Sequence, residues 1–125
     1  MINGINLGTL DIDSKDPIAL CDFYAEMLGW EKTKLYNCPS LHNEAGFSLL
    51  FLEVDDLDYV APVWPEEEGK QQKQMHLDFF VDDLTTAVAQ AEALGAVKTK
   101  EQFGDNYFVT LLDPDGHPFC LCSKE

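Results

Sequence analysis

The sequence has few basic residues: 8 Lys and Arg stand against 23 Asp and Glu, which gives a formal net charge of −15. Nucleic-acid binding depends on Lys and Arg that neutralise phosphates, and anionic membrane surfaces attract the same residues. The deficit therefore argues against both kinds of partner. The simplest interpretation of the acidic excess is solubility, and the alternative is a surface that attracts cationic ligands.

The sequence also lacks long apolar runs and the cysteine motifs that are typical of metal and redox sites. No run approaches the roughly 20 residues of a membrane-spanning helix, and Met1–Asp13 lacks the basic and apolar regions of a signal peptide. We therefore expect a cytoplasmic protein. Its four cysteines form no C-x-x-C, so neither a zinc knuckle nor a thioredoxin-like site is indicated, and we expect reduced thiols. A chain of 125 residues with 46% hydrophobic residues is typical of one folded domain.

Two segments of the chain carry the same features in the same order. Each has an apolar strand pattern, then an aspartate that suits a helix N-cap, then a helical pattern that ends in Leu-Gly. The capping aspartates, Asp16 and Asp83, are 67 positions apart, and the terminal glycines, Gly29 and Gly95, are 66 apart. The nearly constant offset indicates that the chain contains one structural unit repeated twice.

The pattern predicts strands over residues 5–12, 30–36, 47–54, 75–81, 96–100, 106–112 and 117–122, and helices over 17–28 and 84–94. We expect a turn over 37–43, which contains Pro39 and Ser40, and a turn at Asp113–Gly116. This order favours an α+β fold with a mostly antiparallel sheet. We expect one domain, 1–125, with a first module at about 1–56, a linker at about 57–73 and a second module at about 74–125.

Several short motifs, in order, cover nearly the whole chain. They are Asp16 with Phe23-Tyr24 and Leu28-Gly29-Trp30, Val63-Trp64-Pro65, His76-Leu77-Asp78, Val81-Asp82-Asp83-Leu84, Leu94-Gly95-Ala96 and Asp113-Pro-Asp-Gly-His-Pro-Phe119. This set resembles the vicinal oxygen chelate superfamily, which includes glyoxalase I, extradiol dioxygenases and bleomycin-binding proteins. It is most similar to the small glyoxalase-like proteins of bacteria.

The resemblance implies two βαβββ modules that form a curved sheet around a cup, and a homodimer. In metal-dependent members the ligands come from the first and last strands of each module, usually as His or Gln, Glu, His and Glu. The matching positions here are Thr9, Glu53, His76 and Cys120, with Glu53 assigned by subtracting the repeat offset of 67. Two of the four match the family pattern, which predicts a degenerate metal site.

Each candidate has an ordinary structural alternative. His76 is predicted as a metal ligand or general base, or as a histidine that hydrogen-bonds within the cup. Glu53 is a ligand or base, or the exposed end of a strand. Cys120 is a ligand, or a small core hydrophobe. Together His76, Glu53 and Cys120 would suit one divalent ion (zinc, manganese, nickel or iron), and the alternative is no cofactor.

Aromatic residues supply the remaining candidates. Phe51, Trp64 and Tyr107 are predicted to line a ligand cup with Thr9 and Cys120, although most aromatic residues in strands belong to the core. Two functions follow. One is a metal-free protein that binds a small molecule, for instance a cationic or aromatic antibiotic. The other is a metal-dependent lyase, isomerase or dioxygenase that acts on a small oxygenated substrate. The charge and the altered ligand set favour the first.

Overall fold

The computed structural model describes residues 1–55 and 57–124, so the expected module boundaries at Asp56 and Glu125 lie outside the described residues. The chain divides into two compact units, Met1–Tyr59 and Val60–Glu125. Each unit has the element order βαβββ, as the family resemblance implies. The α+β class is confirmed, and each unit is described here by itself.

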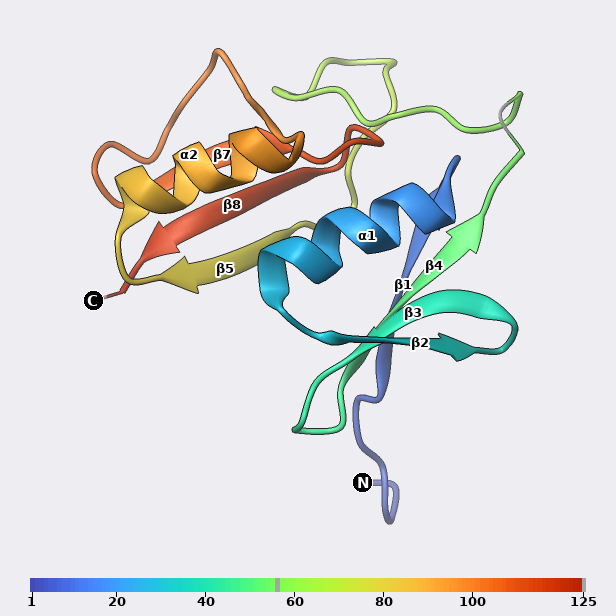
Figure 1. The fold of residues 1–125 in the computed structure, drawn as a ribbon. Coiled ribbons are helices and arrows are strands. Elements are labelled where there is room, and N and C mark those ends of the chain that lie inside the picture. The colour runs from blue at the N-terminus through green and yellow to red at the C-terminus, as the bar shows by residue number, and fades with distance from the viewer. Residues whose placement is uncertain (56, 125) are drawn as a thin grey trace. The chain divides into compact units, whose positions relative to one another are not determined.

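The first unit is a four-stranded mixed sheet with one helix (Figure 1). Its elements are β1 (Thr9–Ser14), α1 (Pro17–Leu28), β2 (Glu31–Leu35), β3 (Cys38–His42) and β4 (Ser48–Glu53). The strand order is β1-β4-β3-β2, with β1 parallel to β4 and the other two pairs antiparallel. Because α1 connects β1 to the far edge of the sheet, the two strands that begin and end the unit become neighbours.

The second unit repeats this plan. Its elements are β5 (Leu77–Val81), α2 (Leu84–Leu94), β6 (Val97–Lys98), β7 (Phe108–Leu112) and β8 (Pro118–Ser123). The order is β5-β8-β7-β6, again with one parallel pair, β5 and β8 (Figure 1). Neither helix is long and apolar enough to cross a membrane, within the part of the chain that the structure describes.

The strand β3 was not expected, and the prediction of a turn over residues 37–43 is wrong. The reversal is shorter: Tyr36 and Asn37 both have positive φ, at 50° and 63°, and join β2 to β3 as a two-residue hairpin turn. Pro39 is tolerated because β3 pairs with β4 only from Ser40 onward, so the missing N–H of the proline interrupts no pairing there.

Each sheet buries one face under its helix. In the first unit the Tyr24 ring of α1 stacks on Phe51 of β4, with centroids 5.8 Å apart, and both side chains are buried. In the second unit Phe79 of β5 packs edge to face on Phe119 of β8 at 6.0 Å. Burial alternates along β5, so Asp78 and Phe80 lie on the opposite face of the sheet from Phe79. We call the side that bears Asp78 the open face of the second sheet.

Of the linker expected at about 57–73, residues 57–59 belong to the first compact unit and residues 60–73 to the second. The Trp64 ring packs edge to face on Phe103 at 6.1 Å, and the Lys73 ammonium lies 4.6 Å from the centroid of the Trp64 ring. Lys73 also pairs with Glu66. The packing of Trp64 on an apolar partner explains why an irregular segment is held in one place.

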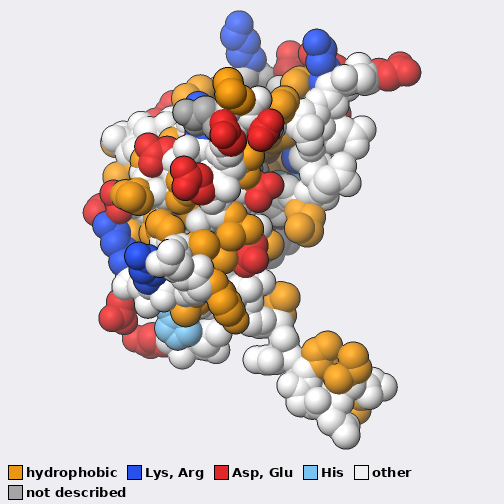
Figure 2. Space-filling model, turned by 90° about the vertical axis from the view of Figure 1, so that its right-hand side faces the viewer, with side chains coloured by type: hydrophobic (Ala, Val, Ile, Leu, Met, Phe, Trp, Pro, Cys, Tyr) orange, Lys and Arg blue, Asp and Glu red, His pale blue; other side chains and the backbone are white. Residues whose placement is uncertain are grey.

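Residues before β1 carry exposed apolar side chains. Met1, Ile2, Ile5 and Leu7 are all exposed, and Figure 2 shows apolar side chains gathered on this segment. The expected strand over residues 5–12 therefore begins four residues later, at Thr9. Acidic side chains occur at several places on the face in Figure 2.

Both helices begin at the expected aspartates. The Asp16 carboxylate accepts a hydrogen bond from Ala19 N at 3.2 Å, and Asp83 accepts one from Thr86 N at 3.0 Å.

Asp83→Ala should lower the free energy of unfolding by about 1 kcal/mol, because one N–H of the first turn loses its acceptor. Urea denaturation would measure this loss. Asp82→Ala is the control, since Asp82 is exposed and pairs with the exposed Lys124; an equal loss in both variants would contradict the capping role.

Candidate functional site

A polar cluster lies on the open face of the second sheet. His76 and Asp78 are two positions apart at the start of β5, and the parallel register places Asp78 beside Cys120 of β8. His76 Nε2 lies 3.1 Å from Asp78 Oδ1. One donor atom from each of the three side chains lies within 4.8 Å of the others. Strand alternation and register therefore bring a nitrogen, an oxygen and a sulfur donor together.

The cluster is exposed on one side and fixed on the other. The side chains of His76 and Asp78 are 39% and 50% exposed, whereas Cys120 is buried. Cys120 Sγ lies 3.4 Å from the hydroxyl of Thr110, its antiparallel neighbour on β7. Burial raises the pKa of the Cys120 thiol and the nearby Asp78 carboxylate adds to that, while the Thr110 hydroxyl and Lys73 oppose the rise. The thiol is therefore protonated at neutral pH when no ion is bound.

An exposed aromatic ring continues the same face. Phe80 follows Asp78 by two positions and is 67% exposed, an unusual exposure for a phenylalanine on a strand. Its parallel partner is Cys122, whose thiol pKa is also raised, first by burial and then by Asp78. An exposed carboxylate and an exposed ring, side by side on one strand, together suit a ligand that is both cationic and flat.

Thr9 and Glu53 lie in the first unit, at opposite ends of the β1–β4 pair. Thr9 is paired with Ser48 and Glu53 with Ser14, so the two residues are separated by five positions of register. Both are exposed. Within their own unit they do not form a site comparable to His76 and Cys120.

The constant repeat offset that selected Glu53 does not hold at the last strand of each unit. Asp11 pairs with Leu50, as its counterpart Asp78 pairs with Cys120, so the positions that match on β4 and β8 are 70 apart. The offset grows because the segment between the helix and the last strand is longer in the second unit. By register the counterpart of Cys120 is the buried Leu50, and Glu53 corresponds to Ser123.

The three predicted aromatic ligand residues lie in different surroundings. Phe51 is fully buried against α1 and belongs to the core of the first unit. Tyr107 is 63% exposed, just before β7. The Trp64 indole N–H is buried and has no hydrogen-bond partner among the described residues.

Asp78 was missed as a site residue. The sequence does carry a signal for it: in a strand, residues two apart share a face, so a site that contains His76 also contains Asp78. The predicted metal ligands came from the family resemblance, which gives His76 at this strand and no carboxylate beside it.

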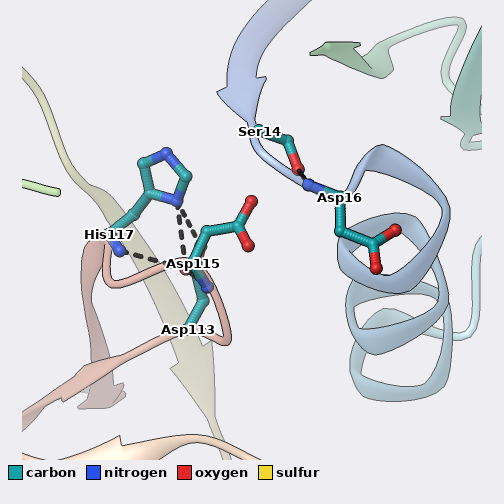
Figure 3. A network of polar contacts seen from close by, with 5 residues as sticks. All are labelled: Ser14, Asp16, Asp113, Asp115 and His117. Carbon is teal, nitrogen blue, oxygen red and sulfur yellow. Dashed lines mark hydrogen bonds and ion pairs between the residues drawn. The ribbon is translucent and has the colours of Figure 1, made fainter. Parts of the chain in front are cut away.

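A second polar group holds the turn between β7 and β8. The side chain of Asp113 is fully buried, and one of its oxygens accepts hydrogen bonds from the backbone N–H groups of Asp115 and His117 at 2.9 and 3.0 Å. His117 Nδ1 lies 2.9 Å from the other oxygen (Figure 3). Figure 3 also shows a local bond in the first unit, where Ser14 Oγ accepts from Asp16 N at 3.1 Å. Both arrangements hold the backbone in place, so we assign a structural role to them.

The residues present in the second unit fit a divalent metal ion of intermediate softness. Imidazole, carboxylate and thiolate are the three ligand types of zinc sites. Two ligand atoms on one tetrahedral ion lie about 3.3–3.8 Å apart, given metal–ligand bonds of about 2.0–2.3 Å. The mutual distances of up to 4.8 Å come within this range through small rotations of the exposed His76 and Asp78 side chains. Three metal ligands were expected from the sequence: His76, Glu53 and Cys120. The structure brings His76 and Cys120 together, and the adjacent carboxylate is that of Asp78.

Comparison with known proteins agrees with the resemblance. The family model described as "Glyoxalase-like domain" matches residues 9–122. No curated protein is similar enough to the chain to count as a match. Among solved structures, a glyoxalase/bleomycin resistance protein/dioxygenase family enzyme from Burkholderia phytofirmans is 18% identical, with 95% of this chain and 98% of that chain covered and a TM-score of 0.70.

Two further structures have the same fold. A protein from Agrobacterium tumefaciens, solved by NMR, is 17% identical over 97% of this chain and 98% of its own, with a TM-score of 0.70. A glyoxalase-related enzyme from Fulvimarina pelagi is 19% identical over 95% and 88%, with a TM-score of 0.64. At these identities the likeness supports the fold alone. Since the family model covers nearly the whole chain, the protein belongs to the glyoxalase-like family, within the vicinal oxygen chelate superfamily.

Proposed function

We propose that the protein binds a small, flat, cationic organic molecule on the open face of the second sheet, and that this binding does not require a metal ion. The observation that supports this most directly is the exposed pair of Asp78 and Phe80 on β5. A carboxylate attracts a cation, and an aromatic face binds a cation or a flat ring, at about 0.5–2 kcal/mol for the aromatic part. The net charge of −15 favours the approach of such a ligand.

The altered family positions support a binding function over catalysis. By register, the first unit offers Thr9 and Leu50 where the second has His76 and Cys120. A threonine and a leucine supply neither an imidazole nor a carboxylate. A metal site that draws ligands equally from both units is therefore degenerate in this chain.

The test compares two ligands that differ in charge. Titration calorimetry with a chelator present would use 9-aminoacridine, which is cationic at neutral pH, and its uncharged parent acridine. We expect the cation to bind more tightly, and both Phe80→Ala and Asp78→Asn to weaken it about tenfold. Tyr36→Ala is the control, because Tyr36 is an aromatic residue of the first unit that is 87% exposed. The proposal would be contradicted by equal affinity for the two compounds, or by a loss of affinity in Tyr36→Ala as large as that in Phe80→Ala.

The second candidate is a metal-dependent lyase, isomerase or dioxygenase, which the cluster of His76, Asp78 and Cys120 favours. A bound ion would supply Lewis acidity to an oxygenated substrate. In this function His76, Asp78 and Cys120 would hold the ion, and Cys120 would be positioned by Thr110. Glu53 would take part only if the two units bring it to the same ion.

The proposal includes a homodimer in the cytoplasm, as the resemblance suggests. All four cysteines are free thiols, which suits a reducing compartment. A self-complementary interface is expected for such a dimer. Light scattering coupled to size-exclusion chromatography would check the mass of the complex.

A further inference from the structure

The geometry points to a zinc-type ion site that is complete within the second unit, with His76 Nε2, the Asp78 carboxylate and Cys120 Sγ as its three protein ligands. This inference goes beyond the proposed binding function and does not depend on it. Its distinctive element is Asp78, which supplies the carboxylate from the same strand as the histidine. No residue of the first unit is needed.

The backbone places these donors before any ion arrives. Asp78 and Cys120 are direct neighbours in a parallel strand pair, and His76 shares their face of the sheet because it is two positions from Asp78. Such neighbours are fixed by the hydrogen-bonded ladder, so little ordering is required of the backbone. The side chains of His76 and Asp78 are exposed and can rotate, while the buried Cys120 is held by Thr110.

Charge and coordination number agree with a divalent ion. A neutral imidazole, a carboxylate and a thiolate carry a total charge of −2, which an ion of charge +2 neutralises. As the sulfur–metal bond forms, the thiol proton leaves to solvent. Three protein ligands leave a fourth tetrahedral position for water or a ligand oxygen. The sulfur and nitrogen donors favour zinc or cobalt over magnesium or calcium, which prefer oxygen.

The first unit provides an internal comparison. The residues that correspond by repeat and register to His76, Asp78 and Cys120 are Thr9, Asp11 and Leu50. This trio has one carboxylate and neither nitrogen nor sulfur donors. The two units share a fold but differ in chemistry, so we expect one ion per chain.

The experiment uses Co²⁺ as a spectroscopic probe of the whole protein, with Zn²⁺ as competitor. Wild-type protein should bind one Co²⁺ per chain with a thiolate-to-cobalt charge-transfer band in the near ultraviolet, and Zn²⁺ should remove the band. Cys120→Ser should abolish the band. Because loss of an outer partner already costs about 10–100-fold in metal affinity, His76→Ala and Asp78→Asn should each weaken Co²⁺ binding by more than about 100-fold.

Matched variants separate this site from its alternatives. Asp82→Asn removes a neighbouring exposed carboxylate, and Glu53→Gln removes the carboxylate expected from sequence; neither should change Co²⁺ affinity. Binding without the charge-transfer band, no binding at all, or a loss in Glu53→Gln as large as in Asp78→Asn would each overturn the inference. Asp78 is half exposed, so Asp78→Asn should remain folded even if Cys120→Ser does not.

The same variants distinguish the two proposals. Asp78→Asn should weaken both the metal and the organic cation, since they share that carboxylate. Phe80→Ala should weaken only the organic cation, and Cys120→Ser only the metal. If the organic cation binds and Co²⁺ does not, the binding function stands and the metal site fails; the opposite result reverses the two conclusions.

Discussion

Phe119→Ala should lower the free energy of unfolding by about 3–5 kcal/mol, the range observed when a buried phenylalanine is truncated. Phe119 lies on β8, which is a central strand of the second sheet, and its side chain is fully buried. It pairs with Leu77 on one side and Leu111 on the other. Its ring packs edge to face on Phe79, with the ring centroids 6.0 Å apart. Removing the ring leaves a cavity under α2 that these neighbours cannot fill without moving strands.

Phe80→Ala is the matched control for this prediction. Phe80 is the neighbour of Phe79 on β5 but points to the open face and is 67% exposed. Truncation of an exposed side chain usually changes stability by about 0.5 kcal/mol or less. Urea denaturation of both variants would measure the two losses. Similar losses would mean that Phe80 is also packed, and the assignment of Phe80 to an accessible binding face would then fail.

The parts of the fold that were predicted correctly depend on local chemistry. The N-caps at Asp16 and Asp83 and the glycines that end the helices act within a few residues, so each is visible in a short window of sequence. The turn at Asp113–Gly116 is of the same kind, with Gly116 at φ 91°. These elements, repeated at a nearly constant offset, were sufficient to predict two similar strand–helix units, whereas β3 was absent from the predicted pattern and the full βαβββ order was implied by the family resemblance.

The parts that could not be predicted depend on pairing between distant strands. The segment Cys38–His42 has the composition of a turn and becomes a strand because β2 and β4 both pair with it. The register of β4 against β1 likewise depends on the lengths of the intervening segments, which differ between the two units. For that reason a constant offset selected Glu53, whereas the register counterpart of Cys120 is Leu50.

The candidate site shows the same division. His76 and Cys120 were selected through the family resemblance, and the structure brings them together with Asp78. The contact between β5 and β8 that creates the cluster joins strands about 40 residues apart, so no local pattern specifies it. The exposure of Phe80, which the proposed function requires, is likewise a property of the folded sheet.

Asp113→Ala should destabilise the protein by about 3 kcal/mol or more, because it removes the acceptor for several buried or partly buried donors at once. The carboxylate of Asp113 is fully buried and accepts from Asp115 N, His117 N and the His117 ring. An unsatisfied buried N–H group costs about 1–3 kcal/mol. The turn that these bonds hold joins β7 to β8, and β8 carries Cys120, so the candidate site depends on it.

Asp113→Asn separates the hydrogen bonds from the charge. The amide oxygen of asparagine can replace the carboxylate oxygen that accepts from the two backbone N–H groups, whereas the amide nitrogen faces the His117 ring and requires that ring to accept. We therefore expect a loss of about 1–2 kcal/mol, between wild type and Asp113→Ala. Thermal and urea unfolding would rank the three proteins. If Asp113→Asn were as unstable as Asp113→Ala, the interaction with His117 would be the larger contribution; if both matched wild type, the turn would be held by its backbone alone.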